Sequence, residues 1–167
     1  NCAAAKEIRD KKISTASQLL NRLKGVLPSD TRFRESFASA TVSKAYLARY
    51  YLRALERQAK GDPEPELVPN PNAEAVNLEH VLPQNASVAW KHIPPEEQLL
   101  LLKRLGNMGL MKTKINTKAG NDGYSSKRPL YAKSDFVLTR EIAGQATWDR
   151  AAVDKRQARL ADLAVQT

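Results

Sequence analysis

A set of polar residues in this chain has the types and the order that metal-assisted hydrolysis requires. Glu79 and His80 are adjacent in the segment VNLEHVLPQN, and Asn107 and Asn116 follow nine residues apart. Imidazole has an ordinary pKa near neutral pH, so His80 is the candidate general base. Carboxylate and amide oxygens suit a hard cation, which makes Glu79 and Asn116 candidate metal ligands. Asn107 is the candidate for fixing the loop that carries the histidine.

The adjacency of Glu79 and His80 limits how they can act together. Neighbouring residues in a regular strand point to opposite faces of the sheet. Both side chains therefore reach one metal ion only if the strand ends or twists between them. Pro83, which follows shortly afterwards, is expected to help end the strand.

Each of these residues also has a purely structural explanation. His80 could cap a strand edge by donating its ring N–H to a backbone carbonyl. Asn107 could be a turn residue after a glycine. Asn116 could be the N-cap of its own short helix. Their order along the chain favours catalysis over three unrelated structural roles.

The elements that must position these residues are mostly helical. Segments AVNLEHVL and MGLM are expected to form short strands, and KINTKAG to form a short helix directly after them. A strand, a strand and a helix in this order are what a metal-dependent phosphodiesterase of the His-Me finger type needs. Apolar periodicity and turn residues predict further helices over 13–27, 29–40, 41–60, 94–105, 125–134, 138–145 and 147–165.

Particular residues are expected at the ends and in the cores of these helices. Asp30 and Thr147 are the predicted N-caps of the second and the last helix. The aromatic stripe of 41–60, with Tyr46 and Tyr50, is expected to be core, as are the two tryptophans, Trp90 and Trp148. The segment GDPEPELVPNPNAEA is expected to be a connector.

Composition narrows the possible partners. The chain has 167 residues, 42% of them hydrophobic, and a net charge of +9, which favours a polyanion such as nucleic acid. Residues 103–133 hold eight Lys and Arg against Asp122 alone, so +7 of this charge lies just after the Glu-His pair.

The single cysteine, Cys2, excludes an internal disulfide and a cysteine-based zinc site. No apolar run approaches the roughly 20 residues that span a membrane.

Several motifs resemble one known family. LEHVLPQ, RLGNMGLMKTKIN and YSSKRPLYAKS, in that order, resemble the HNH nuclease domain at the C-terminus of GmrSD-type modification-dependent restriction endonucleases. A similar domain occurs in a phosphorothioate-sensing anti-phage nuclease. The resemblance extends from about Tyr46 onward and includes the helix with Trp148 and Arg156. Each motif alone is common by chance, but their combination is specific.

The resemblance implies a role for each matching position. His80 would deprotonate water, Asn107 would orient its loop, and Glu79 and Asn116 would bind Mg²⁺ or Mn²⁺. Asn116 stands where the HNH signature has its last histidine, so the signature reads H-N-N in this chain. An amide oxygen at that position favours Mg²⁺ or Mn²⁺ over zinc. The family's hydrolysis leaves a 5′-phosphate and a 3′-hydroxyl. Expected supporting residues are Tyr131 and Ser134, and expected DNA-binding residues are Lys112, Lys114, Lys118, Lys127 and Arg128. Lys127, Tyr131 and Ser134 match the family's K-x-x-x-Y-x-x-S stretch, whose residues would support the site or contact DNA.

We therefore expect an α+β, predominantly helical chain with a small ββα-metal (His-Me finger) core and flanking helices. An N-terminal helical subdomain over 1–64 would precede a nuclease core over 65–167. The resemblance implies a cytoplasmic bacterial antiviral or restriction effector acting on double-stranded DNA. It also implies an N-terminal NTPase-like sensor domain outside this chain, which we take to be a fragment of a longer protein.

Two other functions compete with this hypothesis. One is a non-catalytic DNA- or RNA-binding module that uses the basic residues of 103–133. The other is a helical protein-interaction domain whose charge is incidental, since a charge run is usually a solvated surface.

Overall fold

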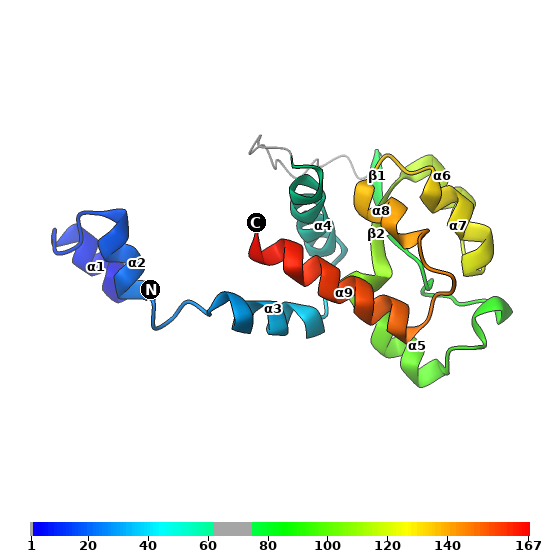
Figure 1. Cartoon of the computed structure of the whole chain (residues 1–167), viewed down its shortest axis with the longest axis horizontal. Coiled ribbons are helices and arrows are strands. Elements are labelled where there is room, and N and C mark those ends of the chain that lie inside the picture. The colour runs from blue at the N-terminus through cyan, green and yellow to red at the C-terminus, as the bar shows by residue number, and fades with distance from the viewer. Residues whose placement is uncertain (1, 62–74) are drawn as a thin grey trace. The chain divides into compact units, whose positions relative to one another are not determined.

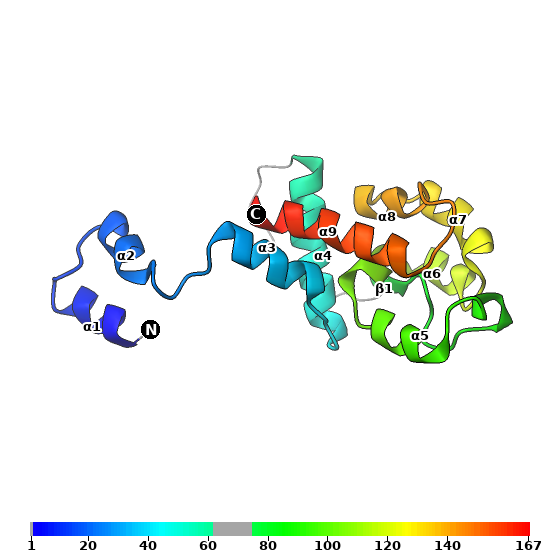
Figure 2. The same ribbon diagram turned by 60° about the horizontal axis from the view of Figure 1, so that its bottom comes forward.

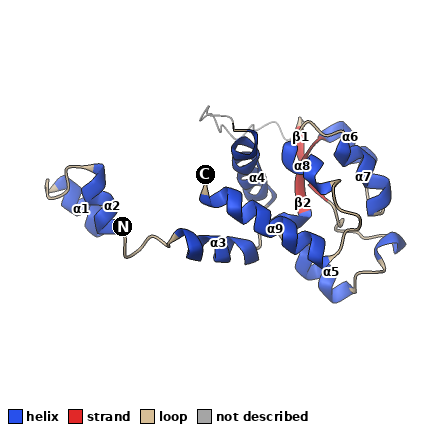
Figure 3. Ribbon diagram, viewed as in Figure 1, coloured by secondary structure: helices blue, strands red, loops and turns tan. Residues whose placement is uncertain are grey.

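The computed structural model describes residues 2–61 and 75–167, which form helices and one small sheet (Figure 1, Figure 3). This confirms the predicted α+β class with helices predominating. The predicted connector falls almost entirely on 62–74, outside the described residues. The helices are α1 (Cys2–Arg9), α2 (Ala16–Leu23), α3 (Asp30–Ser39), α4 (Ala45–Lys60), α5 (Pro95–Leu101), α6 (Thr113–Ala119), α7 (Tyr124–Ala132), α8 (Val137–Ile142) and α9 (Arg150–Val165), with short 3-10 turns at Val88–Trp90 and Leu105–Asn107.

Contacts within the chain divide it into two units, Asn1–Phe33 and Arg34–Thr167. In the first unit, α1 and α2 are joined by an ion pair in which Arg22 Nε lies 2.8 Å from Glu7 Oε2. The boundary between the units falls within α3, and the second unit holds the sheet and the helices from α4 onward. The predicted boundary after residue 64 lies outside the described residues, and α4, which precedes it, packs against both strands.

The sheet consists of two antiparallel strands, β1 (Val76–His80) and β2 (Met108–Lys112). Their register pairs His80 with Met108 at one end and Val76 with Lys112 at the other. Because side chains alternate between the faces, Leu78 and His80 share one face and Glu79 points to the other. Helix α6 begins at the residue after β2, which gives the strand–strand–helix order expected from the sequence.

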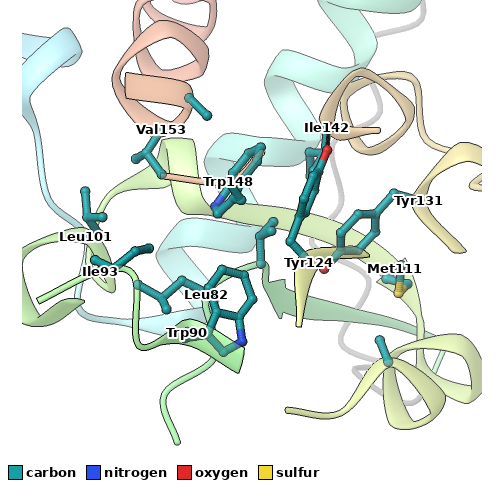
Figure 4. Close-up of a cluster of buried hydrophobic side chains, with 13 residues drawn as sticks. Leu82, Trp90, Ile93, Leu101, Met111, Tyr124, Tyr131, Ile142, Trp148 and Val153 are labelled. Carbon is teal, nitrogen blue, oxygen red and sulfur yellow. Dashed lines mark hydrogen bonds between the residues drawn. The ribbon is translucent and has the colours of Figure 1, made fainter. Parts of the chain in front are cut away.

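Each face of the sheet packs on a different core. Leu78, Met108 and Leu110 join a cluster with the inner face of α4, and α9 runs across α4 in both views (Figure 1, Figure 2). Met111, on the opposite face, joins the cluster drawn in Figure 4, which also contains Tyr131 from α7 and both tryptophans. Trp90 and Trp148 are 0% and 1% exposed, which confirms that they belong to the core.

The exposure of Tyr46 and Tyr50 corrects the prediction that both are core residues. Their exposed fractions are 61% and 46%. Helix α4 buries Ala48, Leu52 and Leu55 instead. The aromatic stripe is broader than the surface that the neighbouring elements cover, so its outer half remains in solvent.

Some predicted helix ends are also wrong by a few residues. Asp149, not Thr147, caps α9, and its Oδ1 accepts a hydrogen bond from the backbone of Ala152 at 2.9 Å. Asp30 is the first residue of α3 rather than its N-cap. The predicted helix over 94–105 ends at Leu101. The chain then leaves the helix and forms a 3-10 turn over Leu105–Asn107, directly before β2.

Candidate active site

His80 is the last residue of β1 and lines a pocket of about 270 Å³ between the sheet and the start of α4. Burial lowers the pKa of His80 below its ordinary value, and the positive charge of Lys127 lowers it further. A lower pKa keeps the imidazole neutral at neutral pH, which is the form that accepts a proton. The other residues of the pocket wall are Val42, Ser43, Ala45, Ala48, Leu78, Gln84, Leu102, Lys103 and Met108.

Lys127, on α7, is buried beneath the segment that carries His80. Its ammonium lies 2.9 Å from Glu79 Oε1 and also donates to the carbonyl oxygens of His80 at 3.0 Å and Val81 at 3.3 Å. The hydroxyl of Tyr131 donates to the same Glu79 oxygen at 2.6 Å. These buried groups therefore fasten α7 to the end of β1.

The position of Lys127 corrects its predicted role in DNA binding. The residue is 1% exposed, so its ammonium does not reach a surface where a phosphate could approach. A buried charge of this kind requires a partner, and Glu79 provides it.

The position of Glu79 argues against a direct part in binding a metal. The residue as a whole is 3% exposed, and its carboxylate faces α7, where Lys127 and Tyr131 donate to it. His80 lines a pocket on the opposite face of the sheet. Burial raises the pKa of Glu79, and this effect is opposed by Lys127 and by the hydrogen bond from Tyr131.

The side chain of Asn107 fixes the backbone just after His80. Its Oδ1 accepts from the amide of Leu82 at 2.9 Å, and its Nδ2 donates to the carbonyl of Leu82 at 3.0 Å. The indole of Trp148 donates to the same Oδ1 at 3.1 Å. The amide of Val81 donates to the Asn107 carbonyl at 3.0 Å. These contacts fasten the backbone after β1 to the turn that precedes β2.

The turn that presents Asn107 is itself held by α9. A side chain at Gly106 would collide with the carbonyl oxygen of Val153, so only glycine allows this close approach. The amide of Gly106 donates to Gln157 Oε1 at 2.6 Å. The Arg156 guanidinium donates to the carbonyls of Leu105, Gly106 and Met108. Burial lowers the pKa of Arg156 to about 10, which still leaves it charged at neutral pH.

Asn116 lies in the second turn of α6 and contacts β1 close to His80. Its Nδ2 donates to the carbonyl of Leu78 at 3.1 Å. Lys112 is the N-cap residue of α6, so Asn116 is not the cap of this helix. With the amide nitrogen directed to Leu78, the oxygen of the same amide has no hydrogen-bond donor among the described residues.

The remaining predicted site residues lie at different distances from this centre. Lys112 is at the other end of β2, roughly 13 Å from the His80–Met108 pair at strand spacing, and forms an ion pair with Asp135 at 2.6 Å. Lys114 and Lys118 are exposed on α6. Arg128 is exposed on α7 and donates to the carbonyl of Ala143 at 2.8 Å.

Ser134 lies just beyond the end of α7, away from the contacts of His80. Its hydroxyl accepts from the amide of Phe136 at 3.2 Å, and its carbonyl accepts from Arg140 at 2.6 Å. The residue is 7% exposed. Ser134 therefore supports the turn into α8, whereas Tyr131 contacts Glu79 directly.

The donor atoms restrict the kind of metal that this region can hold. Within residues 2–61 and 75–167, no three His, Cys, Asp or Glu side chains gather where a metal ion could bind. A cation here would depend on amide oxygen, water and substrate phosphate. That donor set fits Mg²⁺, which prefers oxygen and keeps several of its waters.

Comparison with known families identifies the family of this chain. The model of the family described as GmrSD restriction endonucleases, C-terminal domain, matches residues 27–163. The chain belongs to this family. The match to the GmrSD C-terminal domain covers α3 through most of α9, including β1, β2 and every predicted site residue. None of the curated proteins matches the chain. No helix in the described part of the chain is both long and apolar enough to cross a membrane.

Proposed function

We propose that this chain is the DNA-cleaving domain of a GmrSD-type restriction endonuclease and that His80 is its general base. The observation that carries the proposal is the placement of His80 at the end of β1, where its side chain lines a pocket, burial lowers its pKa, and the backbone at and after it is held by two other elements. Lys127 holds the His80 carbonyl from α7, and Asn107 holds the next residues from the start of β2. A positioned base of this kind requires a rigid support.

The proposed reaction is hydrolysis of a DNA phosphodiester. A ring nitrogen of His80 accepts a proton from water, and the oxygen of that water bonds to phosphorus. The bond from phosphorus to the 3′ oxygen then breaks, and this oxygen takes a proton from solvent. The products are a 5′-phosphate and a 3′-hydroxyl.

A bound Mg²⁺ or Mn²⁺ would stabilise the charge that develops on the phosphate. We propose the Asn116 side-chain oxygen as its protein ligand. Support comes from the Asn116–Leu78 contact, which fixes the amide beside the strand that carries His80. Glu79 acts in this scheme as the buried partner of Lys127 and not as a ligand.

The exposed lysines of α6, Lys114 and Lys118, remain proposed DNA contacts. They lie four residues apart, so they share one face of the helix that carries Asn116. Lys112 and Arg128 are exposed as well, but each already has a partner in Asp135 or Ala143. We further propose that an NTPase-like sensor domain, N-terminal in the parent protein, licenses cleavage of foreign DNA.

The test of this function is cleavage of supercoiled plasmid by the 167-residue chain in Mg²⁺ or Mn²⁺. We expect relaxed or linear DNA, inhibition by a chelator, and nicks that DNA ligase reseals, because ligase requires a 5′-phosphate beside a 3′-hydroxyl. Products that carry a 3′-phosphate would contradict the proposed bond cleavage. Absence of cleavage, both by the chain and by its full-length parent, would contradict the function itself.

A further inference from the structure

The outer side of α4 combines positive charge with exposed aromatic rings. One stripe of this helix, which we call the α4 basic face, consists of Tyr46, Arg49, Tyr50 and Arg53. Each of these residues lies three or four positions from two others, so their side chains are neighbours on the helix surface. Tyr46 and Tyr50 are 61% and 46% exposed, and both arginines are half-buried. Long arginine stems that pack on the helix while the charged ends reach solvent would give such partial burial.

The α4 basic face begins beside the pocket of His80. Ala45 and Ala48 line that pocket. Arg49 lies one helical turn beyond Ala45, and Arg53 lies a turn further along. The start of α4 is held there because the amide of Val42 donates to the carbonyl of Lys103 at 2.7 Å. The stripe is thus continuous with the wall of the pocket.

No acidic side chain neutralises this face within the described residues. Glu56 is the one acid in α4, and its carboxylate is 5% exposed because it accepts from the amides of Val137 and Leu138 at the start of α8. Neither Arg49 nor Arg53 forms an ion pair with any described residue. Lys103, exposed on the pocket wall, adds a further positive charge.

We propose that the α4 basic face binds the phosphate backbone of double-stranded DNA and leads it to the pocket of His80. Phosphates fit a row of tyrosine hydroxyls and arginines that form no ion pair with the described residues, since both side chains donate to phosphate oxygens. This places the main DNA contact on α4, before β1 in the chain, in addition to the lysines of α6. The inference rests on the proposed function for the choice of DNA as the ligand.

The test measures how tightly the 167-residue chain binds a labelled DNA duplex. Fluorescence anisotropy reports the binding, and no divalent cation is present. Arg49→Gln combined with Arg53→Gln should weaken binding on the order of tenfold for each lost phosphate contact at 0.1 M salt. The slope of log K against log salt should fall in magnitude by about 2. The matched control is Lys12→Gln with Lys155→Gln, because both lysines are exposed and the charge change is the same. The control should bind as the wild type does.

A charge-preserving pair separates phosphate binding from damage to α4. Arg49→Lys with Arg53→Lys should keep most of the affinity and of the salt dependence. The proposal is overturned if the wild-type chain does not bind DNA, if the glutamine pair binds within twofold of the control, or if the lysine pair loses as much as the glutamine pair. Because no cleavage is needed, the two proposals fail separately. Arginine-dependent binding would support the α4 basic face even if neither the chain nor its full-length parent cut DNA, a result that would contradict the nuclease function.

Discussion

The ammonium of Lys127 and the carboxylate of Glu79 form a buried ion pair 2.9 Å apart, directly beneath the backbone of His80. Both side chains are almost completely excluded from solvent, at 1% and 4% exposure. The pair supports the backbone of His80, the residue that we propose faces the substrate. Its importance for stability and its importance for catalysis can be measured separately.

Removing one member of this pair should strongly destabilise the fold. Lys127→Met leaves Glu79 as a buried carboxylate without a cation, and breaking a buried pair in this way costs about 3–5 kcal/mol. Urea denaturation should show the loss, and Glu79→Gln in the same chain should recover part of it. Lys118→Met, on the exposed side of α6, is the matched control and should change stability by less than about 0.5 kcal/mol. A Lys127→Met chain as stable as this control would refute the buried pair as a structural element.

The lowered pKa of His80 predicts the acid side of the pH–rate profile. Burial and the charge of Lys127 hold the imidazole neutral to lower pH than an exposed histidine. Cleavage should therefore rise with pH around a midpoint below 6.5. A midpoint at or above 6.5 would contradict this environment.

The same pKa shift affects folding stability in a defined direction. Between the folded pKa and 6.5, the unfolded chain holds a proton on this histidine and the folded chain does not. Stability from this group therefore falls as pH drops through that window. His80→Gln should reduce this part of the pH dependence in urea titrations, and an unchanged dependence would show that other groups cause it.

Asn107→Ala should weaken both the fold and the activity. The substitution leaves the amide and carbonyl of Leu82 and the indole of Trp148 without their partner, and each unpaired buried group costs about 1–3 kcal/mol. Thermal denaturation measures the first effect. Cleavage measured well below the melting temperature measures the second, and activity equal to wild type there would show that the loop does not need this clamp.

Asn116 should determine how much metal the reaction needs. If its oxygen is a ligand, Asn116→Asp should reach half-maximal cleavage at a lower Mg²⁺ concentration, because a carboxylate is the stronger ligand for a hard cation. Asn116→Ala should need more. Thr117→Ala, on the exposed side of the same helix, is the control and should behave as wild type. Identical Mg²⁺ curves for all four chains would exclude Asn116 as the ligand.

The order of the elements could be predicted from the sequence because its signals are local. Alternation around His80 and Met108, and the short polar segment that begins at residue 113, are patterns within a few residues. The Lys127–Glu79 pair joins residues 48 positions apart, and a lysine in a charge run is most often at the surface. Nothing in its neighbourhood marks it as buried. The basic run therefore predicted a DNA contact where the structure has a support.

The same limit explains why no supporting role was predicted for two polar residues of α9. Gln157 and Arg156 read as polar positions of an amphipathic helix, yet both contact the turn that carries Asn107, some 50 positions earlier in the chain. Tyr46 and Tyr50 show the converse. Their spacing predicts a stripe, but which part of that stripe is buried depends on neighbours that periodicity does not identify.

The most direct test of the central claim compares His80→Ala with His92→Ala under single-turnover conditions on supercoiled plasmid. His92 is exposed at the surface near Trp148 and has no part in the proposed site. We expect the His80→Ala chain to bind DNA normally and to cleave roughly 10²–10⁴-fold more slowly, the range typical of a lost general base. The His92→Ala chain should cleave at close to the wild-type rate. Equal cleavage by the folded His80→Ala chain and the wild type would contradict His80 as the base.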